Sequence, residues 1–175
     1  MTTMNLSPNG VPHHYDPLEQ LNNFLPKDPN IDKILGEIDK NKADTLRKSI
    51  EDYRKQAFID YKTGHLNKNA FNEVLKHIIE GRKENTELQK EHMTVAILDL
   101  NYLKTFNNQS EQGCGDAAIK YMTDFVTKRL REHDGKRSND DKRTHDLFTR
   151  MSGGDEFGVI MRNCEPEVAK KRLDE

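Results

Sequence analysis

The chain has 175 residues, of which 33% are hydrophobic and 33% are charged, a balance that allows one domain with a modest core under a strongly solvated surface. Its formal net charge of -2 excludes the basic surface that would attract nucleic acid or an anionic membrane. Cys114 and Cys164 match no metal-binding or redox spacing, and residues 1–12 are too polar for a signal peptide. No apolar run approaches the roughly 20 residues that cross a bilayer. We therefore expect a reduced, cytoplasmic protein with no nucleic-acid partner and no membrane segment.

The N-terminal part has two kinds of sequence. Residues 1–30 hold five of the six prolines among Asn, His and Asp, which predicts a flexible or loosely docked leader. Apolar residues at helical spacing then predict a short helix over 31–38 and a longer one from 43 to about 59. The longer helix carries an apolar stripe that steps by four, three and four: Leu46, Ile50, Tyr53 and Ala57. This stripe fits either a short coiled coil or a helix packed on its own domain. We therefore divide the chain into a polar leader with a short helix (1–42), a separate helix (43–59) and a domain (60–175).

Helices alternate with strands in the domain. A turn at Thr63-Gly64 precedes a helix with an apolar face that we expect to end at Gly81. Met93–Leu100 is a continuous apolar run with β-branched residues, which predicts a strand buried on both faces.

A third amphipathic helix is predicted from 118 to about 130, and residues 133–145 are polar enough to form an exposed loop. Two short apolar runs, Leu147–Met151 and Phe157–Met161, flank two glycines and two acids, which predicts a β-hairpin. Pro166 suits the first turn of a last helix. This order predicts an α/β fold, an α+β sandwich of helices on one sheet.

Three acids are expected near one another at the edge of this sheet. Asp99 ends the buried strand, while Asp155 and Glu156 lie at the hairpin tip. Carboxylates that converge repel one another and favour a hard divalent cation such as Mg²⁺. The segment Leu100–Lys104 leaves the strand with free backbone N–H groups and a lysine, which suits phosphate oxygens. Farther along, Asn107 and Asp116 add an amide and a carboxylate that together could hydrogen-bond a purine edge.

Three segments resemble motifs of the GGDEF family and follow the family order. Gly153-Gly154-Asp155-Glu156-Phe157 carries the sequence that gives the family its name. Asp60–Lys68 resembles the family's opening Asp-x-Leu-Thr-Gly-Leu-x-Asn-Arg segment. Leu98–Asn108, followed by Gly115-Asp116, resembles its Asp-x-Asp-x-Phe-Lys-x-x-Asn-Asp strand and loop. The resemblance runs from about residue 45 to the end and implies a central sheet like that of nucleotide cyclases and polymerase palms, flanked by helices.

The resemblance implies a diguanylate cyclase, which condenses two GTP into cyclic di-GMP, a bacterial second messenger, and releases pyrophosphate. The 3′-hydroxyl of one GTP would attack the α-phosphate of another, with Mg²⁺ (or Mn²⁺) activating the hydroxyl and neutralising phosphate charge. Each domain binds one GTP, so catalysis implies a homodimer, and the family places a dimerising signalling helix at residues 43–59. A catalytically silent regulatory module that binds GTP or cyclic di-GMP is the alternative.

The resemblance also implies a role for individual residues. Asp99, the carbonyl of Leu100 and Asp155 would bind the metal, and Glu156 beside them would have a metal or catalytic role. The GTP-binding set would comprise the backbone amides of Tyr102, Leu103 and Lys104, the guanine-reading Asn107 and Asp116, and Gly154, where a Cβ would obstruct the nucleotide.

Two features depart from the family pattern. Arg143-Thr144-His145-Asp146 matches the Arg-x-x-Asp motif at which product inhibits many relatives, although it lies one residue farther from the glycines. In a loop rich in Arg and Asp, a product-inhibition site at Arg143 and Asp146 and an accidental match are about equally favoured. Relatives also continue beyond the last helix with a further helix, a strand and basic residues, so we expect a domain truncated at its C-terminus.

Overall fold

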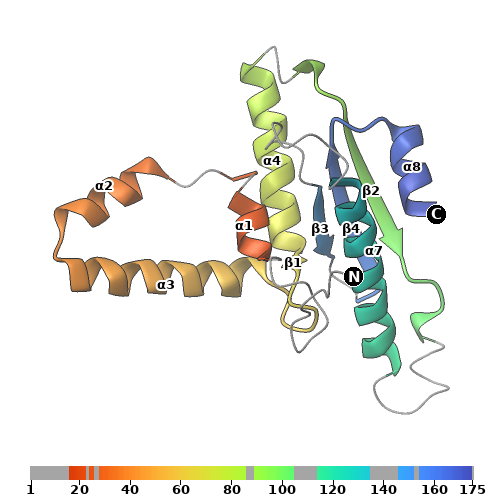
Figure 1. The fold of residues 1–175 in the computed structure, drawn as a ribbon, viewed down its shortest axis with the longest axis horizontal. Helices are drawn as coiled ribbons and strands as arrows, with labels where there is room; N and C mark the ends of the chain where they lie inside the picture. The colour runs from red at the N-terminus through yellow and green to blue at the C-terminus, as the bar shows by residue number, and fades with distance from the viewer. Residues whose placement is uncertain are drawn as a thin grey trace, which may run out of the picture.

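The computed structural model describes residues 16–22, 24–25, 28–85, 89–104, 114–134, 146–151 and 154–174. Their strands form one mixed sheet in the order β1-β3-β4-β2, drawn in Figure 1. The strands are β1 Leu66–Asn67, β2 Met93–Asp99, β3 Leu147–Arg150 and β4 Glu156–Arg162. β4 pairs antiparallel with both β2 and β3, so the predicted hairpin is confirmed. β1 pairs parallel with β3 and was not predicted, because two residues are too short to show an alternating pattern.

The described residues form six helices: α1 Pro17–Asn22, α2 Pro29–Glu37, α3 Lys40–Phe58, α4 Lys68–Glu84, α7 Cys114–Asp134 and α8 Pro166–Asp174. Side-chain oxygens cap the first turns of three of them: Asp28 for α2, Asp39 for α3 and Asn67 for α4. The last helix begins at Pro166 as expected, whereas α4 continues past Gly81 and ends at Glu84. None of the helices in the part described has an apolar stretch long enough to span a membrane.

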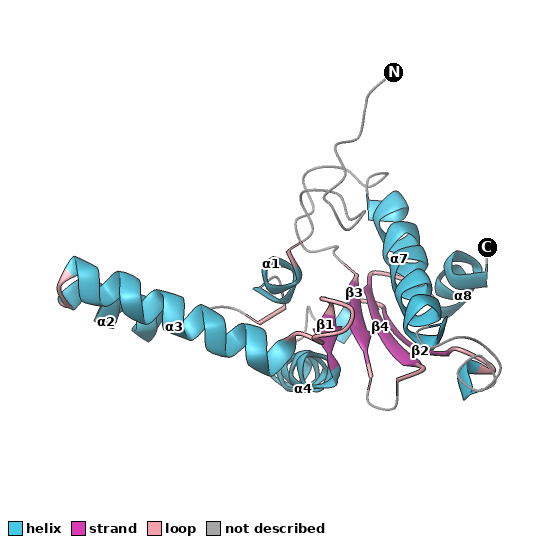
Figure 2. Cartoon of the chain, turned by 90° about the horizontal axis from the view of Figure 1, so that it is seen from below, coloured by secondary structure: helices cyan, strands magenta, loops and turns pink. Residues whose placement is uncertain are grey.

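The two faces of the sheet have separate cores, which the sequence alternation of β4 creates. Phe157, Val159 and Met161 point to one face and pack with apolar residues of α7 and α8. Ile160 points to the other face, where α4 and α1 cover the sheet. Figure 2 shows α4 on one side of the strands and α7 and α8 on the other. The predicted sandwich of helices on a sheet is therefore confirmed.

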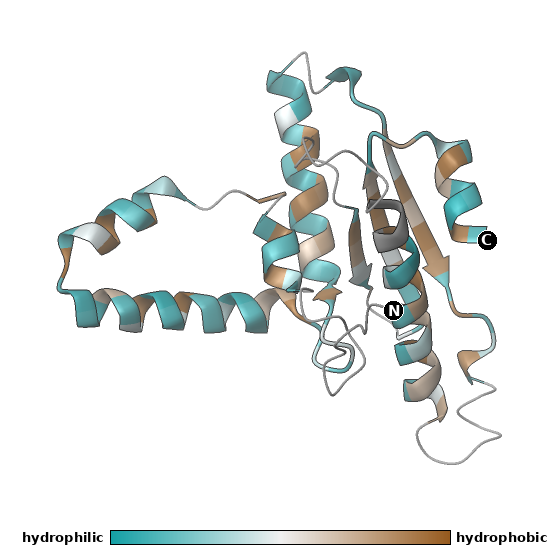
Figure 3. Ribbon diagram, viewed as in Figure 1, coloured by the Kyte–Doolittle hydropathy of each residue, from teal (hydrophilic) through white to brown (hydrophobic). Residues whose placement is uncertain are grey.

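The prediction that Met93–Leu100 is buried on both faces is wrong. Ala96 and Leu98 pack on the α7 core, but Val95 and Ile97 on the opposite face are 42% and 56% exposed. β2 lies at the edge of the sheet and, in the part of the chain described, pairs with β4 alone. Figure 3 shows this edge strand as hydrophobic along most of its length. The continuous apolar run therefore belongs to an edge strand. No described helix covers the face of β2 that carries Val95 and Ile97.

Part of the expected leader is also in the core. Leu18, Leu21 and Phe24 are at most 7% exposed and pack with Leu66 and Val74. The prediction used the overall composition of residues 1–30, in which these few apolar side chains are outnumbered by polar ones. It therefore missed a short helix, α1, that docks beside α4.

α2 and α3 form a helical hairpin that projects from the rest of the molecule (Figure 1). α3 buries only Ala43 among its described residues, and its stripe residues Leu46 and Tyr53 are 42% and 72% exposed. Leu46 and Tyr53 of the stripe are therefore not packed on the chain's own domain, whereas Ile50 is half-buried beside α1 and α2. The coiled-coil alternative stays a prediction.

β4 passes close to α4 at Gly158. A Cβ built at this position would lie 2.7 Å from the ring of Phe71 and 2.9 Å from the Thr149 hydroxyl. Both neighbours are buried, so we expect Gly158→Ala to lower the free energy of unfolding by about 1–3 kcal/mol. Urea unfolding measures this change. Gly36→Ala is the matched control, because a Cβ there meets nothing within 4 Å and alanine favours the helix; equal effects of the two variants would contradict the packing argument.

Candidate functional site

The register of β2 against β4 brings the three predicted acids to the same end of the sheet. Asp99 lies opposite Glu156, and the Leu100 N–H donates to the Asp155 carbonyl over 2.8 Å. No three of the described His, Cys, Asp and Glu side chains form a group that could hold a metal ion. Asp155 lies in the bend before β4, and Glu156 is the first residue of that strand. The donors fit Mg²⁺, which one or two carboxylates commonly hold together with substrate phosphates, so two of these acids suffice.

The loop after β2 has the backbone form of an anion-binding turn. Tyr102 has a φ of 66°, in the left-handed region that non-glycine residues seldom adopt, and Leu103 and Lys104 begin a helical turn. A left-handed residue followed by helical ones turns consecutive N–H groups toward one side. Leu103 is 7% exposed and packs in the α7 core, which fixes the turn, while Lys104 is exposed. The predicted phosphate-binding amides thus lie in a suitable segment next to Asp99.

The described part of the hairpin tip requires glycine at position 154 for its own backbone. Gly154 has a φ of 102°, which strains any side chain larger than hydrogen. Its carbonyl accepts a hydrogen bond from Arg150 Nη2 at 3.3 Å, which ties the tip to β3. The family resemblance implies glycine here because a Cβ would obstruct the nucleotide. The positive φ of Gly154 favours glycine even when no nucleotide is bound.

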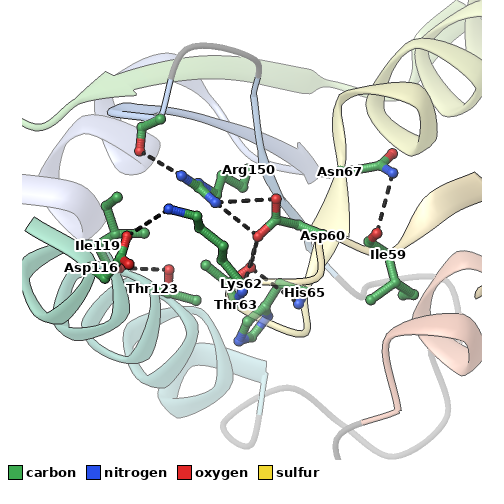
Figure 4. Close-up of polar contacts among 11 residues, drawn as sticks. Ile59, Asp60, Lys62, Thr63, His65, Asn67, Asp116, Ile119, Thr123 and Arg150 are labelled. Carbon is green, nitrogen blue, oxygen red and sulfur yellow. Dashed lines mark hydrogen bonds and ion pairs between the residues drawn. The ribbon is translucent and has the colours of Figure 1, made fainter. Parts of the chain in front are cut away.

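Asp60 and Arg150 connect the hairpin tip to the loop that opens the domain. Arg150 Nη1 lies 3.0 and 3.2 Å from the two Asp60 carboxylate oxygens, and the side chains are 8% and 17% exposed. Asp60 also accepts from the N–H and hydroxyl of Thr63, each at 2.9 Å (Figure 4). Burial favours a higher pKa for Asp60, but the hydrogen bonds from Arg150 and Thr63 outweigh it and lower that pKa. No role for Asp60 or Arg150 was predicted from the sequence. An acid three residues before Thr63 was the available signal for a side chain that closes the turn.

This pair should make stability depend on pH in a defined direction. The folded-state pKa of Asp60 lies below its ordinary value of 3.8, so its contribution is complete above that value and is lost as the pH falls through the folded pKa. We expect Asp60→Asn to cost about 1–3 kcal/mol of unfolding free energy at pH 7, because Arg150 then lacks a partner of opposite charge. The difference in unfolding free energy between the wild type and Asp60→Asn should be smaller near pH 3. Urea unfolding at both pH values tests this, with the exposed Asp52→Asn on α3 as control; a constant difference would exclude the ion pair as the cause.

Asp116, the predicted guanine-reading acid, lies in the first turn of α7 and has an ion-pair partner that the sequence did not suggest. Lys62 Nζ donates to Asp116 Oδ1 at 2.8 Å (Figure 4). The hydrogen bond to Asp116, followed by its charge, raises the pKa of Lys62. The two side chains are 38% and 63% exposed and therefore accessible to a ligand.

The other predicted residues are only partly placed. Asn107 and Arg143 lie outside the described residues, as do Gly153 and most of the predicted 133–145 loop. Asp146 is described: its side chain has no exposed surface and lies 3.0 Å from Arg172 Nη1 of α8. Product binding by Asp146 would require this ion pair to open. The product-inhibition site remains a prediction.

Comparison with known proteins agrees with these motifs. The family model described as "Diguanylate cyclase, GGDEF domain" matches residues 57–174, which is more than half of the chain. The diguanylate cyclase DgcP of Pseudomonas aeruginosa is 26% identical over 132 residues, and the cyclic di-GMP phosphodiesterase NbdA of the same species is 29% identical over 124 residues. These matches cover 75% and 69% of this chain but only 17% and 14% of the two relatives.

Solved structures show the same fold at low identity. The GGDEF domain of DgcB from Caulobacter crescentus, in complex with c-di-GMP, superposes with a TM-score of 0.53 at 22% identity, covering 67% of this chain and 59% of that one. Vibrio cholerae LapD, an S helix-GGDEF-EAL protein bound to c-di-GMP, gives a TM-score of 0.50 at 20% identity over 75% of this chain and 27% of that one. The mixed sheet flanked by helices is thus the fold of these GGDEF structures. From the matched family model, the order of the three motifs and this fold, the chain belongs to the GGDEF family.

Proposed function

We propose that this chain is the catalytic domain of a diguanylate cyclase, which joins two GTP into cyclic di-GMP with release of pyrophosphate. The observation that carries the proposal is the pairing of β2 with β4. It sets Asp99 opposite Glu156 and ties Leu100 to Asp155, so the acids of two separate motifs lie at the same end of the sheet. A purely structural hairpin would need none of these acids there.

Each residue has a defined part in the proposed reaction. Asp99, Asp155 and the Leu100 carbonyl would hold Mg²⁺ or Mn²⁺, with Glu156 beside them. The metal, when bound, supplies charge that lowers the pKa of the attacking 3′-hydroxyl and stabilises the phosphoryl transition state. The amides of Tyr102, Leu103 and Lys104 would bind the phosphates, and Asn107 and Asp116 would bind guanine.

The reaction needs two GTP-loaded domains facing each other, because each holds one substrate molecule. We propose a homodimer in which α3 brings the domains together. Its exposed apolar residues Leu46 and Tyr53 support this role, since a helix that buries only Ala43 gains little from its own domain. The two free cysteines, Cys114 and Cys164, agree with a cytoplasmic protein.

A silent regulatory module is the second candidate. The observation that favours it is that no three of the described acids, histidines and cysteines form a metal-binding group. Such a module would bind GTP or cyclic di-GMP without turnover, and NbdA, which is named a phosphodiesterase, shows that a matching segment can lie in a protein named for a different activity.

Two assays on one preparation separate the candidates. Calorimetry with GTP measures binding, and a coupled assay with Mg²⁺ measures pyrophosphate release. A cyclase binds GTP and releases pyrophosphate, with a specific activity that rises with protein concentration as two domains meet. GTP binding without pyrophosphate release at any concentration would support the silent module instead.

A further inference from the structure

Lys62 is a feature of this chain that the family motif does not contain. It occupies the position at which the Asp-x-Leu-Thr-Gly segment has leucine, so an ammonium group replaces an apolar side chain. Its Nζ reaches Asp116, 54 residues farther along, at 2.8 Å. An exposed lysine–aspartate pair contributes at most about 1 kcal/mol to stability, so folding alone does not account for a lysine here.

Hydrogen bonds to the side chain and to the carbonyl of Asp60 hold the loop that carries Lys62 in place. Asp60 accepts hydrogen bonds from Thr63 and Arg150, and the Gly64 N–H donates to the Asp60 carbonyl at 2.8 Å. Gly64 has a φ of 72°, which fits the tight turn. Figure 4 shows Lys62 extending from this loop toward the first turn of α7. Its ammonium group is therefore presented from a fixed backbone.

Lys62 and Asp116 together offer a donor beside an acceptor, both open to solvent. The guanine edge carries the complementary pair in adjacent positions: O6 accepts, and N1–H donates. Adenine reverses both groups at the same positions, with an amine at position 6 and a bare N1. The Lys62–Asp116 pair would thus form two hydrogen bonds with guanine. With adenine in the same orientation, Lys62 would face another donor and Asp116 another acceptor.

We infer that Lys62 is a base-specificity residue that donates a hydrogen bond to guanine O6 while Asp116 accepts from N1–H. This inference rests on the proposed function, because it assumes that GTP binds at Asp116. Lys62 would contribute to nucleotide binding and to the choice of base, and would take no part in the chemical step.

The test measures nucleotide affinity by calorimetry for wild type, Lys62→Met and Lys62→Arg. Three triphosphates serve as probes: GTP, inosine triphosphate, which keeps O6 and N1–H, and 6-thio-GTP, which keeps N1–H but has a sulfur that accepts hydrogen bonds weakly. Lys62→Met should weaken the binding of GTP and of inosine triphosphate about tenfold or more, and the binding of 6-thio-GTP much less. Lys62→Arg, which retains a donor, should restore most of the lost affinity. Lys76→Met, an exposed lysine on α4, is the control and should change nothing.

The outcomes separate the inference from the function on which it rests. Equal losses for GTP and 6-thio-GTP would overturn a bond to O6. Tighter GTP binding by Lys62→Met would also overturn it and show that the lysine competes with the base for Asp116. Failure of the wild type to bind GTP would overturn the proposed function together with this inference, whereas wild-type binding that Lys62→Met leaves unchanged would overturn the inference alone.

Discussion

Asp155→Ala should reduce cyclic di-GMP formation by at least about a hundredfold while the domain stays folded. The reason is that a Mg²⁺ site built on few protein ligands loses a large share of its affinity with one carboxylate. Loss of that charge should not destabilise the domain, because the β2–β4 register places Asp155 at the same sheet end as two other acids, and removing one of several like charges loses no attraction. The same result is expected for Asp99→Ala. Product yield by chromatography and the thermal unfolding midpoint are the two readouts.

Glu73→Ala, an exposed acid on α4, is the matched control and should keep full activity. High Mg²⁺ should recover part of the activity of Asp155→Ala if the defect is metal affinity. Wild-type rates in both Asp99→Ala and Asp155→Ala would refute the metal assignment.

Preference for GTP over ATP should be about a hundredfold or more, and Asp116→Ala should remove most of it. Asp116 can accept from guanine N1–H and the exocyclic amine, whereas adenine presents a bare N1 to the carboxylate. A mismatched polar group that the bound base covers is heavily penalised, which is how sites built on hydrogen bonds reject analogues. The ratio of the two dissociation constants, measured by titration, reports the preference.

Asp124→Ala serves as control, since this acid is exposed on the same helix but lies outside the proposed site. It should leave the ratio unchanged. Equal binding of ATP and GTP by the wild type would contradict the assignment of Asp116 to the base.

The sequence predicted the parts of the fold that have a clear period and the parts of the site that lie in contiguous motifs. The hairpin and α8 follow directly from short apolar runs, glycines and a proline. What it missed depends on tertiary contacts. Whether Val95 and Ile97 are covered depends on how far α4 reaches across the sheet, which the strand's own sequence does not record.

The candidate site shows the same division. Asp99 and Asp155 were predicted from motifs, and strand pairing puts the end of β2 beside the hairpin tip. The links Asp60–Arg150 and Lys62–Asp116 join residues 90 and 54 positions apart and have no local pattern. They emerge only when the opening loop, the hairpin and α7 are placed together.

The measurement that tests the central claim most directly is the mass of the product formed from GTP. The chain is incubated with GTP and Mg²⁺, and the mixture is analysed by mass spectrometry beside an Asp155→Ala sample. The proposed function predicts cyclic di-GMP in the wild-type sample, in an amount that rises more steeply than protein concentration, and essentially none from the variant. Intact GTP in the wild-type sample under conditions in which calorimetry shows it bound would contradict the claim and leave a nucleotide-binding module.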